Sequence, residues 1–398
     1  MRLFHVASDE EIKSGGTTDV YFVRTKRILE AKGLASKRAY AEVTASNLPR
    51  GYGWGVFCGL EETLRLFEGY RVDVKAMPEG TIFRSHDQMG FKVPVLTVEG
   101  PYGEYCVLET PMLGLICEAS GIATAAARMR KLVGNEKTLL SFGIRRMHPA
   151  ISPMIDRAIY IGGFDAVSSL SGAKIIGRDP VGTMPHALII VMGDQVKAWK
   201  AFDEVIEKDV PRVALIDTYY DEKIEAIMAA ESLGERLYGV RLDTPGSRRG
   251  DFKEIVREVR WELDARGFKN VKIFVSGGID EEVLVELSEA GVDGFGVGTS
   301  ISNAHTIDFA LDLVEMEGRM VAKRGKLGGR KQVWRCDRCL QDLVKLAEED
   351  PPKCRQCGES MNPLLKEYIA EGKIIQKLPK AEEIRRHVLE QLNRIGSP

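Results

Sequence analysis

The sequence has no dominant charge and no long apolar run. Its 58 acidic and 56 basic residues nearly cancel, to a net charge of −2, so the chain as a whole is not an obvious binder of nucleic acid or membrane surfaces. No apolar run reaches the roughly 20 residues that a membrane-spanning helix needs. The N-terminus turns acidic at Asp9–Glu11 and lacks the apolar stretch of a signal peptide. We therefore expect a cytoplasmic protein with no membrane and no nucleic-acid partner.

Asparagine and glutamine are also scarce, numbering 13 together, which indicates a heat-adapted source. The sequence contains no internal repeat and no low-complexity tract. Its 398 residues, 44% of them hydrophobic and 29% charged, have the composition of a globular protein but are too many for one ordinary domain. We expect two or three domains with a large core.

Residues 1–110 show the pattern of an α+β domain. Short runs in which apolar and polar residues alternate between turn residues predict strands of an antiparallel or mixed sheet. The expected strands are 69–77 and 91–100, and the expected helices are 36–45 and 60–67.

Residues 111–325 have a different rhythm, in which buried-looking strands alternate with amphipathic helices. Repeated β-α units predict a parallel sheet, and polar residues at the strand ends favour a (β/α) barrel over a doubly wound open sheet. The expected strands are 187–192, 213–217, 238–243, 271–276 and 294–298, and the expected helices are 221–233, 252–266 and 281–290. A basic, Gly-rich linker at 323–331 leads to a third region, 330–398, with a cysteine module and a terminal helix at 381–394.

Four of the seven cysteines form two C-x2-C pairs, Cys336/Cys339 and Cys354/Cys357, with 14 residues between the pairs. Two such pairs present four thiolates to one zinc ion in a tetrahedral shell. A shell filled by sulfur leaves no open position for substrate, so we expect a structural site. Free or redox-active thiols are the alternative.

Two glycine-rich turns, Ser276–Asp280 and Gly296–Ser300, follow the last two expected strands. Gly277, Gly278, Gly296 and Gly298, with Thr299, would let the backbone approach a phosphate, and barrels commonly bind phosphate at this position. Ordinary strand-to-helix turns are the alternative.

Charged residues end two further expected strands. Asp217 and Asp243 offer carboxylates to Mg²⁺ or to ribose hydroxyls, and Arg241 offers paired donors to a phosphate or carboxylate. Surface salt bridges are the alternative for each of them.

Phe142, Arg145 and Arg146 combine an aromatic ring with two guanidinium groups, which suits a flat anionic ring, although a basic surface turn has the same composition. His186 lies in the segment Gly182–Ala187, before the apolar run 187–192. By itself, a single histidine is more often a satisfied polar residue than a chemical group.

Taken together and in this order, these motifs resemble the nicotinate phosphoribosyltransferases of the archaeal type, within the type II phosphoribosyltransferases. The resemblance covers about residues 15–305. It rests on Thr18-Asp19-Val20-Tyr21, Phe142-Gly143-Ile144-Arg145-Arg146, Gly182-Thr183-Met184-Pro185-His186, Asp217-Thr218-Tyr219, Arg241-Leu242-Asp243 and the two glycine turns. Where other members carry Gly-Thr-Ser-Asn, this chain has Ala166-Val167-Ser168-Ser169, so only Ser168 carries over. The family's Asp-Ser-Gly-Asp is Asp243-Thr244-Pro245-Gly246 here.

The resemblance implies an N-terminal α/β sandwich packed on an irregular α/β barrel, and a homodimer whose active sites use residues of both subunits. It implies an enzyme that makes nicotinate mononucleotide and pyrophosphate from nicotinate and phosphoribosyl pyrophosphate with Mg²⁺, for NAD biosynthesis. ATP would drive or stimulate turnover through a phosphorylated His186, which places the enzyme in the ATP-dependent ligase class. The cysteine module would belong to the archaeal branch and would not be catalytic.

The resemblance assigns substrate binding to Phe142, Arg145, Arg146 and the two glycine turns, and also to Asp19, Tyr21, Ser168, Thr183 and Thr218. His186, Arg241, Asp243 and Asp217 carry the chemistry. Catalysis would depend on orientation and electrostatics, because the pyridine nitrogen of nicotinate needs no deprotonation. Two alternatives stay open: a decarboxylating quinolinate phosphoribosyltransferase, and a non-enzymatic interaction protein with a zinc ribbon.

Overall fold

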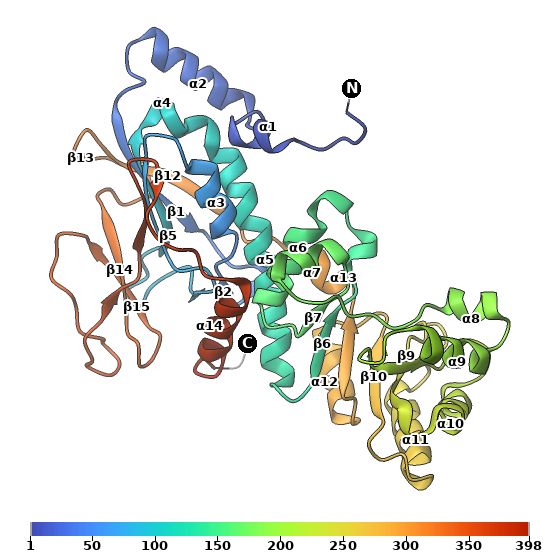
Figure 1. Ribbon diagram of the computed structural model, residues 1–398. Helices are drawn as coiled ribbons and strands as arrows, with labels where there is room; N and C mark the ends of the chain where they lie inside the picture. Colours follow the sequence, from blue (N-terminus) through green and yellow to red (C-terminus); the bar gives the residue numbers. More distant parts are fainter. Residues whose placement is uncertain (1, 397–398) are drawn as a thin grey trace. The chain divides into compact units, whose positions relative to one another are not determined.

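The computed structural model describes residues 2–396 and contains two compact units (Figure 1). The first unit comprises residues 1–127, 161–163 and 305–398, and the second comprises 128–160 and 164–304. The domain boundaries expected from the sequence lie where the local pattern of apolar and polar residues changes, whereas the two units are defined by contacts between distant parts of the chain. The mixed α/β class expected from the sequence is confirmed.

The first unit is built on a seven-stranded sheet in the order β13-β12-β1-β5-β3-β17-β18. Its pairs are antiparallel. Strands near the start of the chain thus pair with strands near its end. The strands are β1 (Arg38–Ala45), β3 (Asp73–Ala76), β5 (Pro94–Pro101), β12 (Phe309–Met316), β13 (Arg319–Met320), β17 (Lys366–Ala370) and β18 (Lys373–Ile374), and a small ribbon pairs β2 (Gly55–Val56) with β4 (Ile82–Phe83).

The helices of the first unit are α1 (Asp9–Lys13), α2 (Val20–Ala31), α3 (Leu60–Phe67), α4 (Tyr102–Tyr105) and α14 (Ala381–Leu392), together with most of α5 (Glu109–Val133). Its hydrophobic core combines sheet residues such as Val43 and Leu96 with Leu64 of α3 and Met112 of α5. The expected helix at 60–67 is therefore confirmed as α3.

The helix expected at 36–45 is wrong, because this segment is β1, a central strand that pairs with β5 on one side and β12 on the other. All of its residues after Arg38 are buried. Its alanines favour helix locally, but pairing on both edges decides the structure. Glu42 is accommodated inside because its carboxylate accepts a hydrogen bond from Lys331 Nζ at 2.7 Å.

The helical stretch Tyr102–Val133 is, by length and composition alone, apolar enough to cross a membrane, unlike what we expected from the sequence. Of its most apolar window, 56% is buried inside the structure, as in the core helix of a soluble protein. Glu109 begins α5, and burial, with a contribution from the charge of Asp312, raises the pKa of its carboxyl group to about 7.

The second unit contains a six-stranded parallel sheet in the order β7-β6-β11-β10-β9-β8. Its edges are β7 and β8, so the sheet forms an incomplete barrel of the kind expected from the sequence. The strands are β6 (Thr138–Ser141), β7 (Ala166–Val167), β8 (Arg212–Leu215), β9 (Leu237–Leu242), β10 (Lys272–Ser276) and β11 (Gly294–Val297). They are almost entirely buried, as strands covered on both faces are.

Most helices of this unit lie between successive strands, α13 follows the last strand, and α10 packs on β9 while α9 packs on β8. They are α6 (Ser152–Ile161), α7 (Leu170–Ile176), α8 (His186–Met192), α9 (Gln195–Val205), α10 (Glu222–Leu233), α11 (Phe252–Ala265), α12 (Glu281–Glu289) and α13 (Thr299–Ser302). The predicted helices at 221–233, 252–266 and 281–290 are confirmed to within a residue or two.

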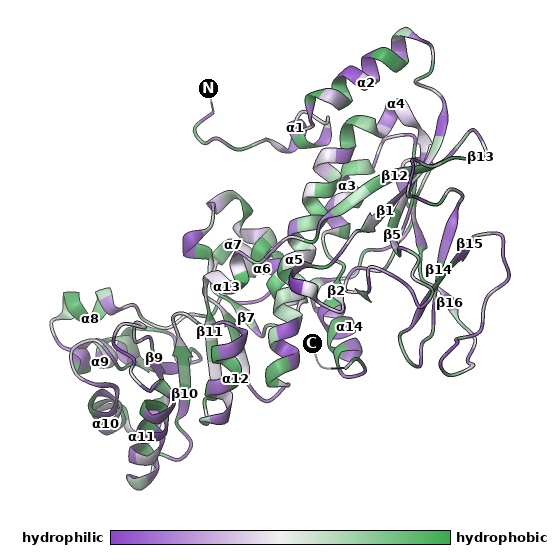
Figure 2. Ribbon diagram, turned by 180° about the vertical axis from the view of Figure 1, so that it is seen from behind, coloured by the Kyte–Doolittle hydropathy of each residue, from purple (hydrophilic) through white to green (hydrophobic). Residues whose placement is uncertain are grey.

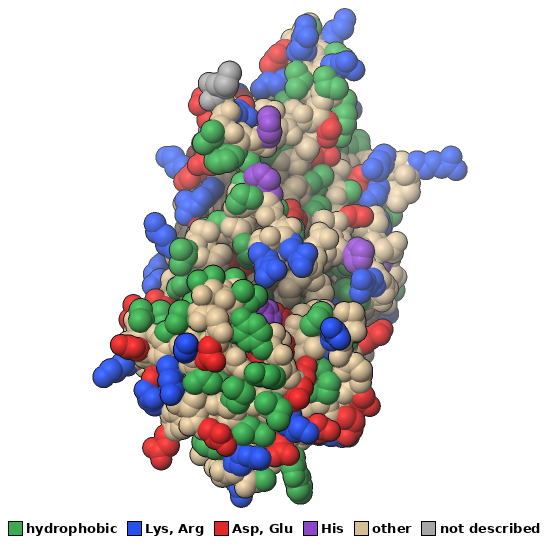
Figure 3. Space-filling model, turned by 90° about the vertical axis from the view of Figure 1, so that its right-hand side faces the viewer, with side chains coloured by type: hydrophobic (Ala, Val, Ile, Leu, Met, Phe, Trp, Pro, Cys, Tyr) green, Lys and Arg blue, Asp and Glu red, His purple; other side chains and the backbone are tan. Residues whose placement is uncertain are grey.

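The strand expected at 187–192 is wrong, because these residues belong to helix α8. A short apolar run fits a buried strand and a helix equally well. Here Pro185 precedes the first helical residue, and Gly193, with a φ of 74°, ends the helix in the left-handed conformation. Only Ile189 of α8 is buried, although Figure 2 shows that the helix is largely hydrophobic. Hydrophobic side chains are exposed on the face of the molecule shown in Figure 3.

Candidate functional site

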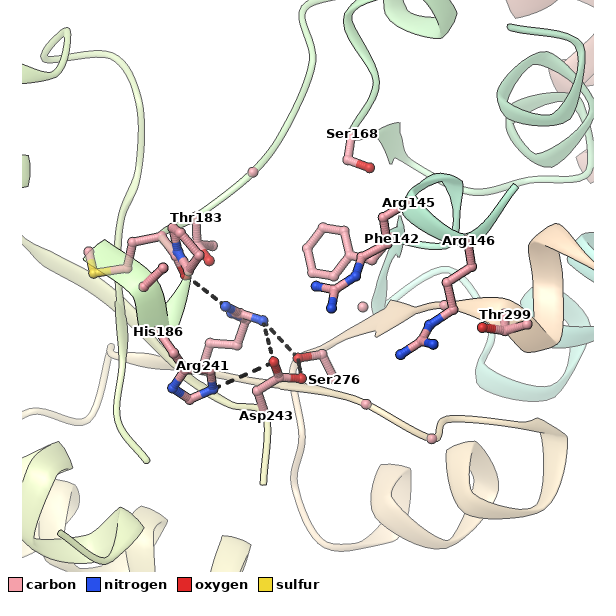
Figure 4. A pocket seen from close by; sticks show the side chains of 18 residues that line it. Phe142, Arg145, Arg146, Ser168, Thr183, His186, Arg241, Asp243, Ser276 and Thr299 are labelled. Carbon is pink, nitrogen blue, oxygen red and sulfur yellow. Dashed lines mark hydrogen bonds and ion pairs between the residues drawn. The ribbon is translucent and has the colours of Figure 1, made fainter. Parts of the chain in front are cut away.

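A cavity of 770 Å³ opens at the carboxyl ends of the parallel strands in the second unit. Figure 4 shows its labelled side chains converging from the carboxyl ends of β9 and β10 and from the segments that follow β6, β7, β9 and β11. It is lined by Phe142, Arg145, Arg146, Ser168, Gly182, Thr183, Met184, Pro185, His186, Ala187, Arg241, Asp243, Ser276, Gly277, Gly278, Gly296, Gly298 and Thr299.

The structure brings together most of the predicted substrate-binding and catalytic residues. Apart from Asp19, Tyr21, Asp217 and Thr218, every one of them lines this cavity. Asp217 and Thr218 contact its lining residues, as described below. Asp19 and Tyr21 belong to the first unit, where Asp19 Oδ2 accepts a hydrogen bond from Thr110 Oγ1 at 2.9 Å and Tyr21 is 55% exposed.

Arg241 lies buried at the end of β9 and is held from two sides (Figure 4). Its Nη1 donates to Ser276 Oγ at 2.9 Å, and its Nη2 donates to the carbonyl of Met184 at 2.9 Å. Asp243 Oδ2 is 3.5 Å from Nη1. Burial lowers the pKa of Arg241, but a guanidinium group stays charged at neutral pH. The pocket therefore contains a fixed positive charge.

Arg145 and Arg146 are exposed in the short helical turn Ile144–Arg146. Within residues 2–396, neither guanidinium group has a hydrogen-bond or ion-pair partner. Phe142, the residue directly after the end of β6, presents its ring to the same cavity (Figure 4). Two uncommitted cations beside an aromatic ring are suited to a flat ring that carries an anionic group.

His186 begins α8 and faces two carboxylates. Its Nδ1 is 3.0 Å from Thr218 Oγ1, and its Nε2 is 3.7 Å from Asp217 Oδ1 and 3.8 Å from Asp243 Oδ2. The contact with Thr218 orients the ring, so Nε2 is the nitrogen directed at the carboxylates. The sequence alone favoured an ordinary polar role for this histidine, whereas the geometry places it between acidic groups at the pocket.

Asp217 is the most deeply buried acid of this group. Its Oδ2 accepts hydrogen bonds from the backbone N–H of Asp243 at 2.5 Å and from Thr244 Oγ1 at 3.0 Å. Its Oδ1 is buried and has no hydrogen-bond partner in the described chain. Burial raises the pKa of Asp217 despite the hydrogen bonds it accepts. A buried carboxylate oxygen without a donor fits a nearby cation, either Mg²⁺ or a protonated His186.

The two glycine turns adopt backbone conformations and close contacts that only glycine accommodates well. Gly277 and Gly278 have φ values of 79° and 63°, which side-chain-bearing residues rarely adopt. A Cβ on Gly296 would lie 2.3 Å from the ring of Phe142, so this glycine makes room for the aromatic ring. These turns place backbone N–H groups beside the cavity.

Sequence reasoning missed Glu225, a buried residue of α10. Its carboxylate accepts three backbone N–H groups in a row, from Thr218 at 3.2 Å, Tyr219 at 2.7 Å and Tyr220 at 2.9 Å. Glu225 thereby holds the turn whose Thr218 contacts His186. The sequence feature that could have identified Glu225 is its place, as a charged residue, on the inward face of the predicted amphipathic helix 221–233.

Arg249 was missed as well. Its guanidinium group donates to the carbonyls of Thr244 at 2.7 Å and Ser276 at 2.9 Å, and also to the carbonyl of Gly277. It therefore ties the loop after β9 to the first glycine turn. Burial lowers its pKa, and the nearby Asp243 and Asp217 oppose that shift.

The four paired cysteines form a separate site in the first unit. Their sulfur atoms all lie within 4.8 Å of one another, and the shorter separations are 3.4 Å for Cys336–Cys357 and 3.3 Å for Cys339–Cys354. Zinc–sulfur bonds of about 2.3 Å in a tetrahedron place sulfurs about 3.8 Å apart, so the set fits a zinc ion.

A three-stranded sheet supports this cluster. Its strands are β14 (Lys331–Arg335), β15 (Asp342–Leu346) and β16 (Asn362–Pro363), in the order β15-β14-β16. Trp334, Leu343 and Met361 pack around the cysteines. All four positions of the shell are filled by protein sulfur, which supports the structural role expected from the spacing.

Family models for quinolinate phosphoribosyl transferase match two parts of the chain, the N-terminal domain at residues 19–120 and the C-terminal domain at residues 122–312. A nicotinate phosphoribosyltransferase of Mycobacterium tuberculosis is 30% identical over 380 residues, covering 86% of this chain and 84% of the relative.

Two solved structures are also similar. A crystal structure of nicotinate-nucleotide pyrophosphorylase from Pyrococcus furiosus is 55% identical, with a TM-score of 0.95 and 99% of each chain covered. The crystal structure of human nicotinic acid phosphoribosyltransferase has a TM-score of 0.76 at 24% identity, over 95% of this chain and 94% of that one, and shows the shared fold.

Proposed function

The chain belongs to the nicotinate phosphoribosyltransferase family, and we propose that it transfers the phosphoribosyl group of phosphoribosyl pyrophosphate to nicotinate. The products are nicotinate mononucleotide and pyrophosphate, in the biosynthesis of NAD. The observation that carries this proposal is the cavity at the strand ends. There an aromatic ring and two unpaired arginines lie beside a buried arginine, the carboxylate of Asp243 and two glycine turns.

Each part of the cavity matches one part of the reaction. Phe142 stacks on the pyridine ring, while Arg145 or Arg146 pairs with its carboxylate. The amides around Gly277 and Gly298 receive the 5′-phosphate. Pyrophosphate leaves C1′ as the ring nitrogen approaches, and positive charge builds on the ribose. Asp243, beside the cavity, stabilises that charge, and Arg241 stabilises the leaving pyrophosphate.

No general base is needed, because the pyridine nitrogen already has a free lone pair. This agrees with a lining in which arginines, glycines and the carboxylate of Asp243 surround the substrate and His186 is left for the ATP-coupled step. Mg²⁺, when bound with phosphoribosyl pyrophosphate, would neutralise charge on the leaving group. The unpartnered Asp217 Oδ1 and the nearby Asp243 are the residues that would hold it.

ATP is part of the same proposal, with His186 as the acceptor of its γ-phosphoryl group. Nε2 forms the bond to phosphorus as the bond from phosphorus to the ADP oxygen breaks. Thr218 fixes the opposite nitrogen, and Asp217 and Asp243 stabilise the ring when it becomes positively charged.

A homodimer in the cytoplasm completes the proposal. Asp19 and Tyr21 match the family motif, and a second copy would supply them to the pocket. The exposed apolar residues of α8, which begins at the pocket residue His186, offer a surface for such a copy: Ile190 (59% exposed), Val191 (84%) and Met192 (38%). The molecular mass in solution tests this part directly.

Quinolinate is the second candidate base, because the matching family models describe quinolinate phosphoribosyl transferase domains. It carries two carboxylates and would release CO₂. Nicotinate is favoured, because the relative that matches 86% of this chain is named for it.

The test incubates purified protein with phosphoribosyl pyrophosphate, Mg²⁺ and one of three bases (nicotinate, nicotinamide or quinolinate), with and without ATP. Chromatography of the nucleotides and trapping of CO₂ report the product. Nicotinate mononucleotide from nicotinate alone is expected. Arg146→Ala should raise KM for nicotinate, and the exposed helix residue Arg257→Ala is the matched control. Formation of the product from quinolinate with CO₂ release would contradict the proposal.

A further inference from the structure

A second cavity, of 420 Å³, lies wholly within the first unit. Three segments distant in sequence enclose it: the turn 86–92, the basic Gly-rich segment 325–328, and the β15 side of the zinc-binding hairpin at 344–349. Glu42 of β1 and Lys331 of β14 also line it. The proposed phosphoribosyl transfer uses none of these residues, so this cavity has no assigned role.

Positive charge exceeds negative charge in its lining. Four lysines (Lys92, Lys326, Lys331 and Lys345) face two carboxylates (Glu42 and Glu349). Lys331 pairs with Glu42 at 2.7 Å, and Lys345 pairs with Glu349 at 2.9 Å. Lys326 pairs with the buried Asp312 outside the lining. Three of the four ammonium groups are therefore neutralised by a neighbour.

Lys92 is the exception. Its Nζ donates to Ser46 Oγ at 3.1 Å, and no carboxylate of residues 2–396 lies within ion-pair distance of it. The Lys92 side chain is partly exposed, and partial burial together with the charge of Lys326 lowers its pKa. The Lys92 ammonium group thus lies near another cation, and its hydrogen-bond partner is a hydroxyl group without negative charge. A bound anion would supply the missing negative charge.

The walls that present these charges are fixed by hydrogen bonds. Asp87 is buried, and its Oδ1 accepts the backbone N–H groups of Met89 at 2.8 Å and Phe91 at 2.9 Å. Its other oxygen accepts the N–H of Val344, in β15, at 2.8 Å. One carboxylate therefore closes the turn that carries Lys92 and ties it to the hairpin of the zinc site.

The remaining wall is apolar. Phe91 and Leu327 line the cavity and are 41% and 56% exposed, and Val344 and Leu346 of β15 line it as well. An aromatic ring and an aliphatic side chain that stay exposed beside unpaired positive charge fit a ligand with a flat apolar part and an anionic part. The volume suits a molecule the size of a mononucleotide rather than a lone anion.

We propose that this cavity binds a nucleotide, with its phosphate on Lys92 and its base against Phe91 and Leu327. On this proposal the zinc site stabilises the β14–β15 hairpin, and the hairpin forms one wall of the cavity. The proposal stands independently of the reaction assigned to the other cavity, since the two share no residue.

The test measures binding of AMP and of inorganic phosphate to the intact protein by calorimetry. AMP should bind more tightly than phosphate, and Lys92→Glu should weaken AMP binding at least about tenfold, because it removes a charge-assisted contact and adds repulsion. Lys92→Gln, which keeps the size of the side chain, should weaken it less. Lys377→Glu, an exposed lysine of the same unit outside the cavity, should leave it unchanged.

Arg146→Ala separates this site from the pocket of the second unit, since it should not alter AMP binding at Lys92. Hydrogen exchange should show AMP protecting residues 86–92 and 323–331. The proposal is overturned if AMP does not bind at millimolar concentration, or if Arg146→Ala and not Lys92→Glu abolishes binding. Equal affinity for phosphate and AMP would overturn the assignment of a nucleotide.

Discussion

Replacing Glu225 with glutamine tests whether the turn after β8 positions His186. The amide oxygen can still accept the N–H groups of Tyr219 and Tyr220, but the amide nitrogen would face the N–H of Thr218, a donor against a donor. An unsatisfied buried N–H costs about 1–3 kcal/mol, and loss of charge from two hydrogen bonds costs about 1 kcal/mol each. The total is about 3–5 kcal/mol if the turn does not relax.

This cost should appear in both stability and catalysis. For a folding unit of this size it lowers the melting temperature by about 6–20 °C. Because Thr218 orients His186, displacement of the turn should lower kcat/KM in the presence of ATP at least about tenfold, equivalent to 1.4 kcal/mol. ATP-independent synthesis should fall less, since the histidine serves only the ATP-coupled step.

The assay compares wild type, Glu225→Gln and Glu231→Gln in thermal unfolding and in initial rates with and without ATP. Glu231 lies exposed on the same helix and controls for the change of charge on α10. If Glu225→Gln melts like the wild type and keeps the same ratio of ATP-stimulated to basal rate, Glu225 does not position His186.

Four further outcomes are expected. His186→Ala should abolish stimulation by ATP and labelling from γ-³²P-ATP while slow synthesis persists; equal labelling of variant and wild type would exclude His186 as acceptor. Nicotinate should be strongly preferred over nicotinamide, because only its carboxylate can form a charge-assisted hydrogen bond with Arg145 or Arg146, worth about 1.5–3 kcal/mol, and equal use of both bases would refute this. About one zinc per chain should be found by metal analysis, and Cys354→Ser should lower zinc content and melting temperature more than the turnover of folded protein; a fully stable, zinc-free wild type would contradict a structural site. The pKa of Glu109 is raised from an ordinary 4.5 to about 7, so the folded state is fully stable below about pH 4.5 and loses stability as pH rises through 7. Glu109→Gln, which carries no charge, should therefore melt above wild type near pH 8 and close to it near pH 5. An equal difference in melting temperature at both pH values would contradict this.

The chemical parts of the pocket could be predicted from the sequence because each is encoded within a few neighbouring residues. One turn contains an aromatic ring and two cations, Phe142 with Arg145 and Arg146, and another contains the paired glycines 277 and 278, which let the backbone approach a ligand. Both properties can be read from the residue types alone. The cysteine site was predictable for the same reason, since two C-x2-C pairs define a four-sulfur shell by spacing alone. The barrel followed from repeated β-α units, each local in sequence.

Long-range pairing decided the rest. An apolar run such as 187–192 fits a helix or a strand, and the alanine-rich 38–45 favours a helix until two strands pair with it. Neither Glu225 nor Lys92 belongs to a motif. Their roles arise because folding buries a carboxylate under three N–H groups and leaves an ammonium group without an acid. Local sequence determines which groups are available, whereas burial and the neighbours that tertiary structure brings determine which of them remain unpaired.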